Sequence, residues 1–153
     1  MLDNIIEDVD FAKLMQKNIQ ELIIHLFNKE QNFGILCKID EVSFEPRLPD
    51  EISAEFRPMT LFFLAGYTFD TARIENATLI FEAGFGSDNF GSFVSVPLLS
   101  IMQVIIDETP ILINLASYNS DFEVNEIEKM DGDGVENSMA SFLSNPENSK
   151  FLK

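Results

Sequence analysis

The sequence has little of several residue types that carry protein chemistry. A single cysteine, Cys37, excludes an internal disulfide bond and a cysteine-rich metal site, and its alternating apolar neighbours predict a buried thiol. A single histidine, His25, comes without the partner that a catalytic histidine needs. Only 10 basic residues stand against 26 acidic ones, and the formal net charge of −16 argues against binding to nucleic acid or an anionic membrane. The sequence therefore predicts a protein that is not an enzyme and has no metal or other cofactor.

Long apolar runs are also missing. No stretch reaches the ~18 residues that a membrane-spanning helix needs. The first residues lack the basic start and apolar core of a signal peptide. We therefore expect a soluble, cytoplasmic protein.

The sequence does contain enough apolar residues for one domain, followed by a polar segment. Hydrophobic residues make up 46% of the 153 residues, and 15 residues are Phe. Residues 117–153 are acidic, rich in Asn and Ser, and poor in apolar residues. Such a segment does not bury enough surface to offset its ordering entropy. We predict one domain over residues 1–116 and a flexible tail over residues 117–153.

The N-terminal part has the pattern of an amphipathic helix. From Phe11 to Phe27 the apolar residues recur in steps of three and four, and Asp8 and Asp10 suit the start of the helix. We predict a helix over about residues 11–30 that packs on a sheet and, because it is so apolar, also contacts a second subunit. The residues predicted at this dimer interface are Phe11, Leu14, Met15, Ile19 and Leu22.

Residues 79–97 are predicted to form the centre of the fold. Leu79, Phe81, Ala83 and Phe85 alternate with other residues at the period of a strand with one buried face. Gly, Asp and Asn in residues 86–91 favour a turn, and residues 93–96 form the returning strand. We expect the following proline to open a buried helix over residues 97–107.

Further strands are predicted on both sides of this hairpin. Alternating apolar residues indicate strands at 35–39 and 42–44, separated by a bend at residues 40–41, and others at 52–56 and 111–115. Residues 67–76 are a connector with a short strand inside residues 69–74. Residues 59–65 are apolar on both faces, so one face should meet the core and the other needs a helix, a partner or a ligand.

The order of these motifs resembles one family. Residues 59–86 are similar to the middle of the stringent starvation protein B (SspB) family of bacterial protease adaptors, in which an apolar strand and a connector precede a Phe-x-Ala-x-Phe-Gly strand. A turn and a Val-x-Val-Pro motif follow. In this chain the matching residues are Phe81, Ala83, Phe85, Gly86, Val94, Val96 and Pro97. The likeness covers about residues 11–116 and is strongest over residues 59–97.

The resemblance implies an α+β fold in which an N-terminal helix precedes a small, Sm-like, partly open β-barrel with an inserted helix, over about residues 34–116. It implies a homodimer formed through the helix. It also implies an adaptor that binds ssrA-like degradation tags in a groove and delivers them to a ClpX-type unfoldase through its disordered tail. The implied groove residues are Phe81, Ala83, Gly84, Phe85, Leu64 and Ala65, and the implied docking residues are Phe151, Leu152 and Lys153.

One position departs from the family. Gly84 stands where the family has an Arg in the groove for the acidic ssrA tag. Loss of that cation should weaken the contact with an acidic peptide. The departure affects the expected peptide specificity more than the expected fold.

Two other interpretations of the sequence are an acidic secretion chaperone and a calcium-binding loop. A small, acidic, dimeric secretion chaperone would also present apolar surface to an unfolded effector, but such chaperones lack a long tail that ends in a docking peptide. A calcium loop starting at Asp131 is rejected, because Glu136 and Phe142 occupy the positions that need Gly and Glu. A tail beyond residue 117 that proteases cleave would favour the adaptor over the chaperone.

Overall fold

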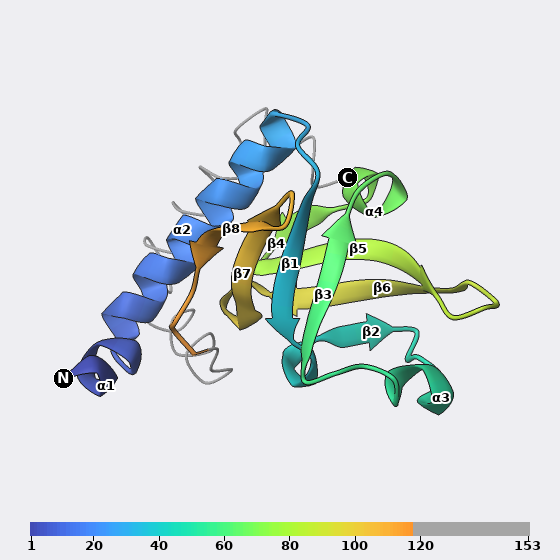
Figure 1. The fold of residues 1–153 in the computed structure, drawn as a ribbon, viewed down its shortest axis with the longest axis horizontal. Helices are drawn as coiled ribbons and strands as arrows, with labels where there is room; N and C mark the ends of the chain where they lie inside the picture. The colour runs from blue at the N-terminus through green and yellow to red at the C-terminus, as the bar shows by residue number, and fades with distance from the viewer. Residues whose placement is uncertain (118–153) are drawn as a thin grey trace, which may run out of the picture.

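A computed structural model describes residues 1–117 of the chain. It has an α+β fold in which a long N-terminal helix accompanies two antiparallel sheets of four strands each (Figure 1). The α+β class and the N-terminal helix are therefore confirmed. The docking residues predicted at 151–153 and the rejected calcium loop lie outside the described residues.

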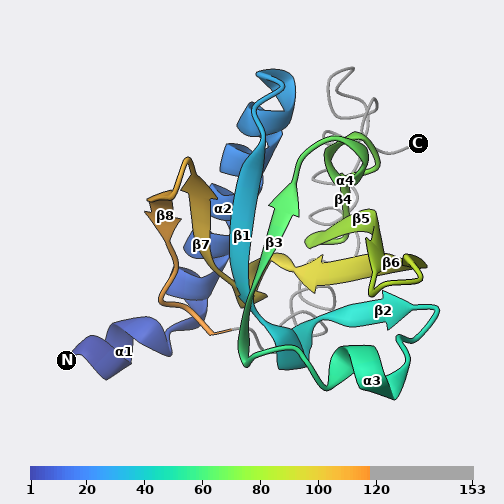
Figure 2. The same ribbon diagram turned by 45° about the vertical axis from the view of Figure 1, so that its right-hand side comes forward.

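The helix forms where its apolar stripe and its capping residue predict it. A short helix, α1 (Leu2–Ile6), precedes the long helix α2 (Val9–Asn28). The carboxylate of Asp8 accepts a hydrogen bond from the Phe11 N–H at 3.3 Å, which caps α2. Ile19 and Ile23 are fully buried on the stripe. The helix lies beside the sheet that carries β7 and β8 (Figures 1 and 2).

The first sheet has the strand order β3-β1-β7-β8. Every pairing in it is antiparallel, with Leu36 opposite Leu61 and Ile35 opposite Val104. The alternation in β1 places Ile35 and Cys37 in the core, as predicted. Its strands are β3 (Met59–Leu64), β1 (Phe33–Lys38), β7 (Ile101–Ile106) and β8 (Thr109–Ile113).

The second sheet has the strand order β2-β6-β5-β4. The predicted central hairpin is confirmed, since β5 and β6 pair from Thr78 opposite Pro97 to Phe85 opposite Phe90. Its turn uses Asn89 at a φ of 53°, a conformation that asparagine tolerates. Its strands are β2 (Ser43–Glu45), β6 (Phe90–Pro97), β5 (Thr78–Phe85) and β4 (Arg73–Glu75).

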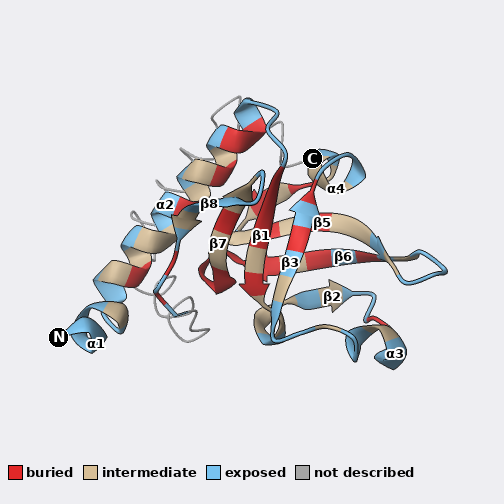
Figure 3. Cartoon of the chain, viewed as in Figure 1, coloured by how far each residue is buried: buried red, intermediate tan, exposed pale blue. Residues whose placement is uncertain are grey.

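The core lies where the two sheets and α2 meet, and the buried residues gather on the strands that face this space (Figure 3). The strands β1 and β3 cross the direction of β5 and β6 in Figure 1. Phe62 of β3 brings its ring centroid to 5.7 Å from that of Phe81 in β5, so aromatic packing ties one sheet to the other. Within residues 1–117 the sheets do not close into a barrel, because β3 pairs only with β1 and β8 only with β7.

The predicted helix at 97–107 is wrong. A single 3₁₀ turn, η2 (Leu98–Ser100), leads into strand β7 instead. A short apolar run has no periodicity that separates a buried strand from a buried helix. Ile101, Val104, Ile105 and Ile106 are β-branched, and such residues favour a strand where a partner strand is at hand.

The predicted strand at 52–56 is also wrong, because residues 50–53 form the single-turn helix α3 (Asp50–Ser53). Pro49 precedes this turn, its carbonyl accepts the Ile52 N–H at 3.0 Å, and Asp50 and Glu51 favour a helix start.

The bend at residues 40–41 is confirmed as the 3₁₀ turn η1 (Ile39–Glu41). The connector at 67–76 holds α4 (Tyr67–Asp70) and the short strand β4. Among the described residues, no helix has the length and apolar character to cross a membrane.

Candidate functional site

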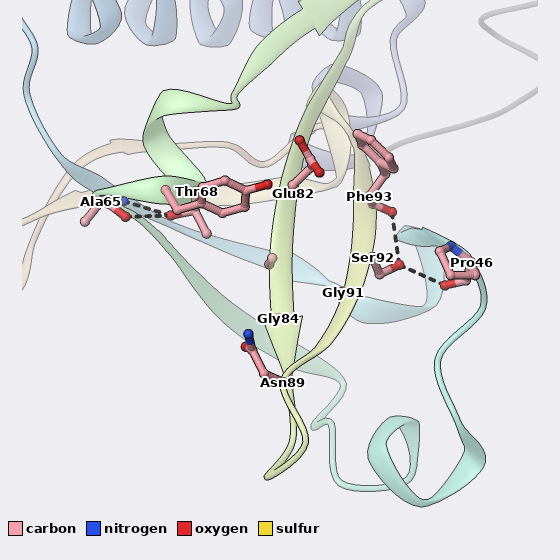
Figure 4. Close-up of a pocket in the computed structure, with 11 residues that line it drawn as sticks. Pro46, Ala65, Thr68, Glu82, Gly84, Asn89, Gly91, Ser92 and Phe93 are labelled. Atoms are coloured by element: carbon pink, nitrogen blue, oxygen red, sulfur yellow. Dashed lines mark hydrogen bonds between the residues drawn. The ribbon is translucent and has the colours of Figure 1, made fainter.

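A groove with a volume of about 690 Å³ lies where β5 and β6 meet the segment that joins β3 to α4 (Figure 4). In Figure 4, Ala65 and Thr68 lie on one side of β5, and Ser92 and Phe93 lie on the other. The carboxamide of Asn89 and the carboxylate of Glu82 also line the groove. The full lining consists of Pro46, Ala65, Tyr67, Thr68, Glu82, Ala83, Gly84, Asn89, Gly91, Ser92 and Phe93.

Threonine hydroxyls hold one wall of the groove in place. Thr68 Oγ1 accepts the Ala65 N–H at 2.9 Å and donates to the Phe63 carbonyl at 2.8 Å, which closes the turn after β3. Thr71 Oγ1 accepts the Glu82 N–H at 3.0 Å and donates to the Tyr67 carbonyl at 2.9 Å. The wall formed by α4 is therefore tied directly to the backbone of β5.

The edge of β5 beside this wall is only half covered. The strand β4 pairs with residues 78–80 of β5, and residues 81–85 pair only with β6 among the described residues. The Glu82 N–H points to the β4 side, since it donates to Thr71 there. Because backbone groups alternate between the two edges of a strand, the N–H and C=O of Gly84 face this same edge. Because the Glu82 N–H is already bonded to Thr71, the open part of this edge is at Gly84, and a further strand can pair there.

Of two facing glycines near the turn, Gly91 leaves the end of the groove open, whereas the side chain of Asn89 fills the space over Gly84. Gly84 and Gly91 stand opposite each other in the β5–β6 pairing, and both are exposed. A Cβ at Gly91 would meet nothing within 4 Å, whereas a Cβ at Gly84 would overlap the side chain of Asn89. The backbone of a ligand can approach the sheet closely at Gly91, where no side chain projects into the groove.

The groove is acidic. Glu82 is the one charged side chain of its lining, and none of the lining residues is Lys or Arg. The Glu82 side chain raises the pKa of the Tyr67 hydroxyl above its usual range, first through hydrogen bonding, and its negative charge adds to the effect. Arg73 on β4 pairs with Glu75 at 3.0 Å and lies 5.9 Å from the ring centroid of Phe93.

The residues expected in a groove are divided between two environments. Ala83, Gly84 and Ala65 line the groove. Phe81 and Leu64 are 1% and 0% exposed, so their side chains belong to the core. They belong there because apolar positions that alternate along a strand mark its buried face.

Phe85 is half-buried, with its ring centroid 5.6 Å from that of Phe44 and 6.0 Å from that of Phe56. The groove is also lined by four residues that no sequence pattern singled out, namely Tyr67, Glu82, Asn89 and Phe93. Glu82 and Phe93 occupy positions that alternate with the buried residues of their strands, and this alternation indicates that both face away from the core. Nothing in the sequence set these positions apart from ordinary solvent-facing ones.

The residues expected at a dimer interface mostly pack within the chain. Ile19 is fully buried in the core, and Leu22 packs against that core. Phe11 and Met15 pack against a second small cluster formed by Ala12, Leu99 and Ala116. Leu14 is 53% exposed and is the member of the set whose side chain is most accessible.

The two-sided apolar character of β3 is confirmed. Phe62 and Leu64 are buried, while Met59, Leu61 and Phe63 on the alternate face are exposed, Phe63 to 64%. Large apolar side chains of β8 are exposed in the same sheet. The first sheet therefore presents an uncovered apolar face, separate from the groove.

Residues 1–117 hold no group of three His, Cys, Asp or Glu side chains that are close enough to bind a metal ion together. The groove instead offers a strand edge, small side chains and one carboxylate. No protein-family model, curated protein or solved structure matches this chain.

Proposed function

We propose that this protein is a non-enzymatic adaptor that binds an extended, ssrA-like degradation tag of a client protein and delivers the client to a ClpX-type unfoldase. The observation that carries the peptide-binding part is the half-covered edge of β5 beside the groove, because a peptide can add there as a further strand. The delivery part is supported by the resemblance to the SspB family over residues 59–97.

A peptide strand along this edge would have both backbone and side-chain partners. Its backbone would pair with the N–H and C=O of Gly84, and successive side chains would alternate between the two sides of the strand. Tyr67 is 63% exposed and Phe93 is 41% exposed, so both rings offer apolar contact area to such side chains. The groove thus combines sequence-tolerant backbone pairing with a few side-chain contacts.

Other parts of the proposal rest on the family resemblance. The two sheets would correspond to the Sm-like, partly open barrel of the family, and a homodimer would form through the N-terminal helix. The acidic tail would act as a leash in the cytoplasm, with Phe151, Leu152 and Lys153 as the docking peptide. Tethering raises the local concentration of the client at the unfoldase, so each contact can be weak.

Peptide binding is tested by titrating the full chain into fluorescein-labelled ssrA peptide and measuring anisotropy. We expect a dissociation constant in the micromolar range or below. Gly91→Trp should weaken binding at least about tenfold, because a Cβ at Gly91 meets nothing within 4 Å and the large ring would take up space in the groove. Asn18→Trp, on the exposed face of α2, is the matched control and should bind as the original chain does. Equal binding by both variants would contradict the groove as the site.

Delivery is tested separately with a chain that lacks residues 150–153. This chain should bind the peptide normally but should no longer stimulate degradation of a tagged client by a ClpX-type protease. Equal stimulation with and without these residues would refute the tether.

The exposed face of β3 favours a second candidate, an acidic secretion chaperone that holds an unfolded effector segment. For a chaperone that uses this face, Phe63→Ser should reduce capture of an unfolded effector while Gly91→Trp leaves it unchanged. The adaptor predicts the reverse order of effects on binding of a tag peptide.

A further inference from the structure

The charge of the groove bears on the kind of peptide that it accepts. Glu82 is its one charged lining residue, and the protein as a whole carries a formal net charge of −16. The nearby cation Arg73 is already paired with Glu75 at 3.0 Å. A peptide in the groove therefore meets a negative potential that no lining Lys or Arg offsets.

Glu82 is placed to pair with a bound side chain. It is half-buried, and its carboxylate has two oxygens that can accept hydrogen bonds from a bound side chain. Phe93 lies directly opposite Glu82 in the β5–β6 pairing. The Arg73 guanidinium already lies 5.9 Å from the centroid of this ring, so the Glu82 carboxylate is the partner that a bound Lys or Arg would find there.

Glu82 also stands at a fixed position relative to the open edge. It is two residues before Gly84 on β5, so the two residues share a face and an edge of the sheet. A strand paired at Gly84 therefore brings one of its side chains close to Glu82. A basic side chain there gains an ion pair, whereas an acidic one meets a like charge in a partly desolvated site.

We infer that, among extended ssrA-like tags, this groove binds a neutral to basic segment, with a Lys or Arg side chain seated against Glu82, more tightly than it binds an acidic one. This inference rests on the proposed peptide-binding function and names the chemistry of its ligand.

The test uses three fluorescein-labelled peptides of equal length and identical apolar residues. Each peptide has two variable positions separated by a single residue, so that both side chains lie on the same face of an extended strand. The two variable positions are both Lys in the first peptide, both Gln in the second and both Glu in the third. At low ionic strength the Lys peptide should bind the full chain about tenfold tighter than the Glu peptide, with the Gln peptide in between. The ratio should shrink as salt is added, because the contact is electrostatic and partly exposed.

Substitutions at Glu82 locate the preference. Glu82→Gln should bring the Lys and Glu peptides to within about threefold of each other while binding of the Gln peptide is kept, and Glu82→Lys should reverse the order. Glu7→Gln changes the net charge by the same amount as Glu82→Gln, outside the groove on the exposed C-cap of α1, and should leave the ratio unchanged.

The outcomes separate this inference from the function on which it rests. Binding of the Glu peptide as tight as that of the Lys peptide, or a preference that survives Glu82→Gln, would overturn the inference while peptide binding stands. Failure of all three peptides to bind at high micromolar concentration would overturn the peptide-binding function and this inference with it.

Discussion

The side chain of Asn89 occupies the space directly over Gly84, across the turn that joins β5 and β6. Gly91, which is opposite Gly84, has open space where a side chain would be. Gly84→Ala should therefore lower the free energy of unfolding by about 1 kcal/mol, whereas Gly91→Ala should leave it unchanged or raise it by about 0.5 kcal/mol. Urea denaturation of both variants measures the difference.

A second substitution checks the cause of this difference. Asn89 has a φ of 53°, a conformation that glycine adopts freely, so Asn89→Gly removes the side chain without backbone strain. Combined with Gly84→Ala, it should recover most of the lost stability. Additive effects of the two substitutions would mean that Asn89 is not the reason for the glycine at position 84.

Hydrogen bonds of the Asn114 side chain connect the end of the described residues to the backbone at the start of β7. Its side-chain nitrogen donates to the Leu99 and Ile101 carbonyls at 3.2 and 2.9 Å, and its side-chain oxygen accepts the Ala116 N–H at 2.8 Å. Asn114→Ala leaves three buried backbone groups without these partners, so we expect a loss of about 2–4 kcal/mol in the free energy of unfolding. Asn18→Ala on the exposed face of α2 is the control, and an equally small effect of both would contradict the prediction.

Glu41 predicts a pH dependence of stability. One carboxylate oxygen is buried without a hydrogen-bond partner, and burial raises the pKa of Glu41 above its usual value of 4.5. The unfolded chain therefore releases this proton at lower pH than the folded chain does. The contribution of protonated Glu41 to the free energy of unfolding is complete below the pKa that Glu41 has in the unfolded chain. This contribution is lost as the pH rises through the higher pKa of Glu41 in the folded chain.

Glu41→Gln should accordingly stabilise the fold near neutral pH, and the gain should shrink as pH falls toward about 4. Urea midpoints of the two chains across this range measure it. The exposed Glu55→Gln is the control. A gain that stays constant or grows on acidification would contradict the assigned cause.

Cys37 should be chemically inert in the folded chain. It is fully buried, burial raises the pKa of its thiol to about 12, and its Sγ donates to the Thr60 carbonyl at 3.6 Å. Reaction with a disulfide reagent near pH 8 should follow opening of the structure and become fast only in denaturant. A cysteine introduced as Ser43→Cys, at an exposed position, should react at once, and equally rapid native labelling of Cys37 would exclude a buried thiol.

The local parts of the fold were predictable from local patterns. The hairpin over residues 79–97 combines strand alternation with Gly and Asn at the turn, and both signals lie within the same short stretch. The capped helix α2 likewise needs only the spacing of its apolar residues and Asp8. The segment at 101–106 was not predictable in this way, because its apolar residues suit a strand or a helix until β1 offers a pairing partner.

The groove was predictable only in part. Ala83 and Gly84 were found through the resemblance, but Phe81 was assigned to the groove although its strand face is the buried one. The other wall comes from α4, which the bond from the Glu82 N–H to Thr71 holds against β5. A contact between residues 11 positions apart with no shared period leaves no mark on the sequence.

By itself, the sequence determined the acidic charge, the amphipathic helix, the central hairpin and the two-sided apolar strand β3, because composition and the periods of helices and strands are properties of neighbouring residues. Only the tertiary structure decided that residues 101–106 form a strand, that Phe81 faces the core, and that the edge of β5 is half open. These features depend on which distant segments pack together, and packing is a property of the whole chain rather than of any stretch of it.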